Sequence, residues 1–245
     1  MTDVLGVSGR AMLNALVAGE TDPAKLATLA RGSLIPKAQQ LGEALRGRFT
    51  PHHGFLLDQI LKQIDHLAGL VADCDARIEH MMRPFAPHLD RLQTIAGVGH
   101  RSAEVMVSEI GVDMSRFATS AHLASWARIC PGTHQSAGKR RSAGTGTGNN
   151  WLRTTLLESA WAASHSRGYL GAQYRRISKR RGPKRAAIAV AHSILVIAYH
   201  ILREGVLFQD LGADYFDRMN STKAKRYHLK RLAELGCDVS KIAAA

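Results

Sequence analysis

The stretch FLLDQILKQIDHLAGLVADCDARIEHMM, residues 55–82, carries the most regular hydrophobic pattern in the chain. Its apolar residues alternate in spacings of three and four, which is the a and d pattern of successive heptads. The positions concerned are Leu57, Ile60, Ile64, Leu67, Val71, Cys74, Ile78 and Met81. No break interrupts the pattern before Pro84. The stretch therefore predicts one long helix of about 40 Å.

Two interpretations of this helix follow from its narrow apolar seam. A seam confined to a and d positions is typical of a coiled-coil arm that binds a second copy of the chain. The alternative is an ordinary amphipathic helix lying on a core within the same chain. The first interpretation predicts a homo-oligomer.

The rest of the chain predicts short helices before this arm and a compact helical domain after it. Residues 1–50 form a helical segment, in which Asp22 and Pro23 supply an N-cap and a first helical residue. The arm spans residues 51–84, the compact domain residues 85–205 and a basic C-terminal tail residues 206–245. The predicted fold class is mostly α.

The longest apolar run, Ala186 to Leu202, is predicted to be a buried core helix. His192 and His200 interrupt it, and it is shorter than the roughly 20 apolar residues that a membrane span needs. No membrane partner is expected. The three cysteines are far apart and form no CxxC pair, which suits a reducing cytoplasm. The histidines show no zinc-ligand spacing, so no metal site and no cofactor is expected in this chain.

The chain contains 33 Lys and Arg against 20 Asp and Glu, a formal net charge of +13. Most of this excess lies between Lys139 and Arg185, where Glu158 is the one acidic residue. A surface of this charge favours a polyanionic partner, and nucleic acid is the partner that we expect. The basic positions predicted to contact phosphates are Lys139, Arg140, Arg141, Arg153, Arg175, Arg176, Lys179, Arg180, Arg181, Lys184 and Arg185.

Residues 89–110 predict a helix-hairpin-helix around the sequence LQTIAGVGHRSA, residues 92–103. Gly97 and Gly99 would permit a tight turn with positive φ. The second helix would begin near Arg101, with its free N–H groups directed at a phosphate. A hairpin that is purely structural is the alternative.

Residues 131–150 are predicted to form a thin, glycine-rich loop after Pro131. Ser136 lies in this loop, directly before the cationic run of residues 139–141. Cations can stabilise the charge that develops on an attacked phosphate, although local chemistry alone does not identify a base for the serine hydroxyl. Asn149 and Trp151 follow the loop, and Trp151 is a candidate for stacking on a base. Trp126 and Trp161 are expected to pack in the core.

Six segments of this chain together resemble the insertion-sequence-110 transposase family. They are GVSGRAMLNALVAGETDPAKLATLARG (6–32), RFTPHHGFLL (48–57), LQTIAGVG (92–99), WARICPGTHQSAGKRR (126–141), GNNWLRTTLLESAWAA (148–163) and AVAHSILVIAYHIL (189–202). The resemblance implies a transposase domain in which Ser136 attacks a DNA phosphate and becomes joined to the strand. It also implies that a structured guide RNA selects the DNA. Ala137 stands between Ser136 and Gly138, where the family has serine followed directly by glycine.

In the family, a nuclease domain with four acidic metal ligands precedes the coiled coil. The resemblance implies that the metal of this domain is magnesium. No such acidic quartet is found before Gly6, so the resemblance implies that a partner nuclease supplies half of the active site. Three hypotheses remain: a serine transposase fragment, a nucleic-acid-binding module without catalysis, and a dimerisation scaffold that regulates a full-length transposase.

Overall fold

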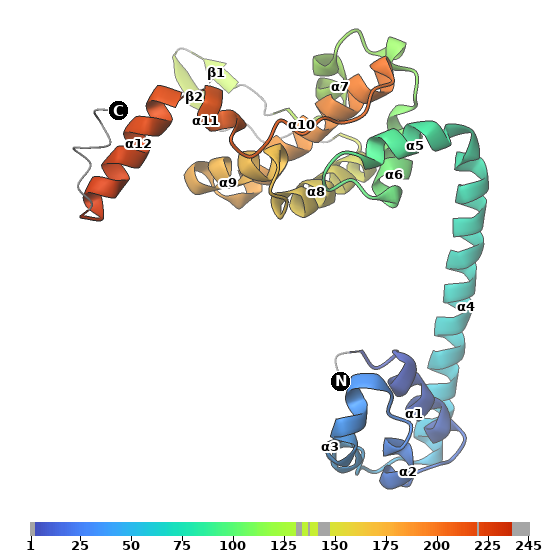
Figure 1. Ribbon diagram of the computed structural model, residues 1–245. Helices are drawn as coiled ribbons and strands as arrows, with labels where there is room; N and C mark the ends of the chain where they lie inside the picture. The colour runs from blue at the N-terminus through green and yellow to red at the C-terminus, as the bar shows by residue number, and fades with distance from the viewer. Residues whose placement is uncertain (1–2, 131–133, 137, 142–147, 220, 237–245) are drawn as a thin grey trace. The chain divides into compact units, whose positions relative to one another are not determined.

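The computed structural model describes residues 3–130, 134–136, 138–141, 148–219 and 221–236. It divides into two units, residues 1–81 and residues 82–245, and each is described here by itself. Nearly all of the regular secondary structure of the described residues is helical, which confirms the mostly α fold class (Figure 1).

The first unit contains α1 (Val7–Val17), α2 (Pro23–Ala27), a 3₁₀ helix η1 (Gly32–Lys37), α3 (Ala38–Ala44) and the long α4 (Pro51–Met82). Its buried apolar residues are Met12, Leu26, Ala27, Ala30 and Leu61. Arg10 of α1 forms an ion pair with Asp65 of α4. The buried Ser8 hydroxyl accepts a hydrogen bond from the Arg31 N–H at 2.9 Å, which ties α1 to the start of η1. This small core holds the first part of α4 against the short helices.

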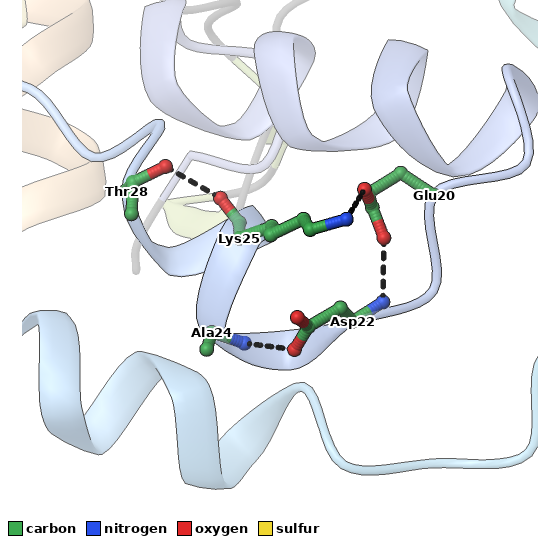
Figure 2. Close-up of polar contacts among 5 residues, drawn as sticks. All are labelled: Glu20, Asp22, Ala24, Lys25 and Thr28. Carbon is green, nitrogen blue, oxygen red and sulfur yellow. Dashed lines mark hydrogen bonds and ion pairs between the residues drawn. The ribbon is translucent and has the colours of Figure 1, made fainter.

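The start of α2 has the local chemistry that its sequence predicts (Figure 2). The Asp22 carboxylate accepts the Ala24 N–H at 2.9 Å, and Pro23 occupies the first helical position. Glu20 accepts the Asp22 N–H at 2.9 Å and pairs with Lys25 at 3.1 Å. The bond from Asp22, and after it the contact with Lys25, lowers the pKa of the Glu20 carboxyl below its ordinary value. The helix ends at Ala27.

Helix α4 has the extent that the heptad pattern predicts (Figure 1). Leu61 is its one buried residue, and all residues of α4 are described. Most predicted seam positions are left uncovered within the first unit: Ile60, Leu67, Val71, Cys74, Ile78 and Met81 are exposed, and Leu57 and Ile64 are half-buried. The coiled coil itself stays a prediction.

The second unit is built around α10 (Pro183–Glu204). It begins with η2 (Arg83–Phe85), α5 (Ala86–Gln93), α6 (His100–Ile110), η3 (Met114–Arg116) and α7 (Ser120–Trp126). After two short strands come α8 (Asn150–Ser164), α9 (Tyr169–Arg181), α10, α11 (Tyr215–Met219) and α12 (Ser221–Glu234). Helix α10 packs against α5, α7, α8 and α9.

By length and composition alone, α10 is apolar enough to cross a membrane. Val190, Ile194, Leu195 and Tyr199 are nevertheless fully covered by the surrounding helices. Tyr199 donates its hydroxyl proton to the Phe117 carbonyl at 3.0 Å. This burial confirms the prediction that residues 186–202 form a core helix.

Candidate nucleic-acid interface

The turn between α5 and α6 lies directly on α8. Gly97 has φ +89°, as predicted, and a Cβ there would lie 2.3 Å from the Ser159 carbonyl oxygen and 2.6 Å from the Ala163 nitrogen. No residue with a side chain fits that space. Glycine at position 97 therefore permits both the positive φ of this turn and its close contact with α8.

Gly99 differs from the prediction, because its φ is −91° and its ψ is 176°. This is extended backbone, the conformation of an N-cap residue, and Gly99 is the N-cap of α6. The expectation of positive φ at Gly99 is wrong for that reason.

Near the start of α6 a buried carboxylate contacts the side chains of an arginine and a histidine. Glu104 has a side chain that is 5% exposed, and it accepts from Arg101 at 2.9 Å and contacts His100 Nε2 at 3.2 Å. Because Arg101 is paired with Glu104, part of the positive charge at the start of α6 is already balanced within the chain. The phosphate-binding role of this hairpin stays a prediction.

Ser136 lies in a short β-hairpin where a loop was expected. Strand β1 (His134–Ser136) pairs antiparallel with β2 (Lys139–Arg141), and Ser136 stands opposite Lys139. Gly138 in the connection has φ +74°. The three cations Lys139, Arg140 and Arg141 thus form the partner strand of the segment that ends in Ser136. The remainder of the predicted loop, residues 131–133, 137 and 142–147, lies outside the described residues.

We call residues 131–147 the serine segment. The residues that flank it on its two sides contact each other. On the incoming side, Arg128 adopts φ 55° and the Ile129 N–H bonds to the Ala124 carbonyl at 3.2 Å. On the outgoing side, a Cβ at Gly148 would lie 2.7 Å from the Ala127 carbonyl oxygen and 2.7 Å from Arg128 Cβ. Gly148 therefore permits the backbone leaving the segment to touch the backbone entering it.

Asn149 occupies a structural position beside Gly148. Its side-chain oxygen accepts the Leu152 N–H at 3.0 Å and caps α8, while its amide donates to Glu109 of α6. Trp151, in the first turn of α8, is 76% exposed, and Arg153 is half-buried. The structure thus brings Asn149, Trp151 and Arg153 together at the start of α8, next to the serine segment.

The strongest cluster of free cations lies where α9 ends and α10 begins. We call this cluster the basic corner; it consists of Lys179, Arg180, Arg181, Lys184 and Arg185, all exposed. Gly182, with φ +83°, joins the two helices. Among the described residues, no carboxylate forms an ion pair with any member of the corner. Lys184 and Arg185 also stand at the positive end of the α10 dipole, where cations raise the potential further and an anion would be stabilised.

Two cations predicted to contact phosphates are engaged within the chain. Arg175 donates to the Ser166 carbonyl at 2.9 Å and to the Ser164 carbonyl at 3.4 Å. Arg176 lies over the Phe216 ring at 5.2 Å and donates to the Phe216 carbonyl at 3.4 Å. Both fix the position of α9 against its neighbours.

Residues 205–219, which we call the strap, contact α9. The sequence pattern did not indicate this contact. Asp210 accepts the Tyr169 N–H at 2.8 Å and so caps α9, whose own N-cap residue is Gly168. The Phe208 N–H donates to the Thr94 hydroxyl at 3.0 Å. The Phe216 ring stacks on Tyr169, with ring centroids 5.2 Å apart. Partial burial, and after it the neighbouring Tyr215, raises the pKa of Tyr169.

The expectation that Trp126 and Trp161 fill the core is wrong. They are 47% and 48% exposed. Trp126 makes a tilted ring contact with Phe117, and Trp161 makes one with Tyr174. The core of this unit is instead filled by Leu, Ile, Ala and Met side chains of helices that pack closely. In the described residues, no group of three His, Cys, Asp or Glu is placed to hold a metal ion.

Comparison with known proteins identifies relatives of the middle of the chain. Residues 89–175 match the family model described as the transposase IS116/IS110/IS902 family. Two pilin gene-inverting proteins, from Moraxella bovis and Moraxella lacunata, are each 28% identical to this chain over 149 residues. Each match covers 59% of this chain and 44% of the relative, so less than half of each relative's length is represented.

Proposed function

We propose that this chain is the DNA-strand-joining part of a serine transposase or recombinase of a bacterial insertion sequence, and that it acts in the cytoplasm. The observation that carries the proposal is that the match over residues 89–175 contains the whole serine segment, with Ser136 on a strand paired to three consecutive cations. The basic corner supplies a phosphate-binding surface just beyond the matched region.

In the proposed reaction, the Ser136 oxygen attacks a phosphorus atom of one DNA strand. A bond between serine oxygen and phosphorus forms, the bond from phosphorus to the leaving strand oxygen breaks, and that oxygen takes up a proton. Cations near the serine stabilise the charge of the pentacovalent phosphate. In the net step the serine loses one proton and the leaving oxygen gains one; the resemblance implies that carboxylates and the metal of a partner nuclease domain would help to activate the serine.

Assembly with partners forms part of the same proposal. The exposed seam of α4 is suited to binding a second copy of the chain, because apolar residues at a and d positions gain burial in a coiled coil. A structured guide RNA is a further proposed partner and, like DNA, would present phosphates to the basic surface.

The test is formation of a covalent adduct. The chain, supplied with the partner nuclease domain, guide RNA and labelled DNA, should yield a protein–DNA species that survives denaturant. Ser136→Ala should abolish this species and leave salt-sensitive DNA binding within about 0.5 kcal/mol of wild type. Ser142→Ala is the control, because Ser142 directly follows the same three cations in the sequence. Loss of the adduct in Ser142→Ala alone would show that Ser136 is the wrong serine.

The second candidate function is a binding module without catalysis, and the unpaired basic corner favours it. In that case no adduct forms from the reconstituted wild type, whereas DNA binding remains. Reversing the charge of Arg180 and Arg181 should weaken binding to all DNA sequences alike under either function, because phosphates carry no sequence information. The adduct assay therefore separates the two functions.

A further inference from the structure

Helix α12, after the strap, has two chemically different faces. One face lies toward α11, where Lys225, His228, Leu229 and Leu232 line a groove together with residues of α11. Among the residues of α12 whose burial is described, the two leucines are the half-buried ones. The apolar side chains of α12 are thus largely directed at its neighbour within the chain.

The opposite face of α12 is cationic. Successive residues of an α-helix are rotated by about 100°, so Arg226, Tyr227 and Lys230 fall on the side away from the groove. All three are exposed, and Tyr227 is 63% exposed between the two cations. Arg231 borders this face and pairs with Glu234 at 3.0 Å. Among the described residues, Arg226 and Lys230 form no ion pair.

The acidic residues of the strap do not neutralise this face, because they are engaged elsewhere. Asp210 caps α9, and Asp214 pairs with Arg218 at 3.1 Å. Asp217 lines the groove on the other side of α12. Glu234 lies on the cationic side of α12 but pairs with Arg231, so Arg226 and Lys230 keep an unbalanced positive charge in the described part of the unit, which favours an anionic partner from outside.

We propose that Arg226, Tyr227 and Lys230 form a second docking surface for the backbone of duplex DNA, in addition to the basic corner. This inference rests on the proposed function. Arginine, lysine and tyrosine side chains all donate hydrogen bonds to phosphates. Charge complementarity favours an anionic partner, and the placement of the apolar residues favours DNA over a membrane. A helix that lies in a membrane surface needs a free apolar face, whereas Leu229 and Leu232 line the groove with α11.

The test compares three double variants of the full chain, measured by fluorescence anisotropy on a labelled random-sequence duplex in 50 and 200 mM salt. Arg226→Gln with Lys230→Gln removes two charges from the proposed surface. Lys37→Gln with Lys225→Gln removes one exposed charge from the first unit and one from the groove side of α12, and is the matched control. Between 50 and 200 mM salt, each phosphate contact accounts for about a 3.5-fold loss of DNA affinity. The first variant lacks two such contacts, so its affinity should fall about tenfold less than the wild-type affinity over this range. The control should retain it.

Three results would overturn the proposal. If the α12 variant responds to salt like the control while Arg180→Gln with Lys184→Gln weakens binding, the docking surface is wrong and the proposed function stands. If the wild type binds DNA without salt dependence, the proposed function fails as well. If the α12 variant loses binding to phosphatidylserine vesicles and keeps full DNA binding, the face is a membrane surface. Tryptophan fluorescence of each variant checks that the second unit is folded.

Discussion

Replacing Gly97 with alanine should destabilise the second unit strongly. The new methyl group would lie 2.3 Å from the Ser159 carbonyl oxygen, so the turn between α5 and α6 has to move away from α8. Overpacking of this kind costs about 1–3 kcal/mol. Holding alanine at φ +89° adds about 1–3 kcal/mol. We therefore expect a loss of roughly 3 kcal/mol or more in the free energy of unfolding.

The assay can observe this unit selectively, because Trp126, Trp151 and Trp161 are the three tryptophans of the chain. Thermal unfolding followed by tryptophan fluorescence should show a fall of about 6–12 °C in Tm for a loss of about 3 kcal/mol. The matched control is Gly99→Ser. Gly99 already has N-cap geometry, nothing lies within 4 Å of its would-be Cβ, and serine is a good N-cap residue.

The two variants decide what the neighbouring glycines do. A Gly97→Ala protein that unfolds like wild type but binds DNA more weakly would refute the packing argument and would favour a backbone approach to phosphate at Gly97. A Gly99→Ser protein that is destabilised as much as Gly97→Ala would refute the assignment of Gly99 as an N-cap.

Three further predictions concern single side chains. Asp210→Ala should cost about 1 kcal/mol and speed amide exchange at Tyr169, because α9 loses its cap; Asp210→Asn keeps an acceptor oxygen and should exchange like wild type. Asn149→Ala should lower the free energy of unfolding by about 1–2 kcal/mol; unchanged stability with weaker DNA binding would show that Asn149 contacts DNA instead. The pKa of Glu20 in the folded chain is lowered from 4.5. The stability that its ionised carboxylate contributes is therefore fully present above pH 4.5 and is lost as the pH falls through the lower folded pKa. Glu20→Gln should therefore weaken the acid dependence of the circular dichroism of a fragment ending at residue 81, and an unaltered acid transition would count against the Glu20–Lys25 contact.

Local sequence patterns predicted the helices well where the pattern is long or the end is marked. The heptad pattern of residues 55–82 predicted α4, and the apolar run of residues 186–202 predicted α10. Asp22 and Pro23 marked the start of α2, because capping depends on neighbouring residues alone. The short strands beside Ser136 were missed, since glycine and cations on both sides carry no alternating apolar pattern.

Features that depend on distant residues could not be predicted in this way. Asp210 caps a helix that begins 41 residues earlier, and no local rule connects the two. Gly97 and Gly99 look equivalent in sequence, and only the packing of α8 on Gly97 distinguishes them. Composition likewise does not tell which face of α7 or α8 is turned inward, so the exposure of Trp126 and Trp161 required the assembled helices.

The contact between Gly148 and the backbone of Ala127 and Arg128 also bears on how this fold can diversify. Because the chain leaves the serine segment where it entered, the entropy of closing the segment depends only weakly on its length, at about 0.6 kcal/mol for each doubling. The helices that pack around α10 need the two junctions and not a particular sequence between them. Insertions, deletions or whole replacements between Cys130 and Gly148 can therefore alter the chemistry carried there while the same helical scaffold is inherited.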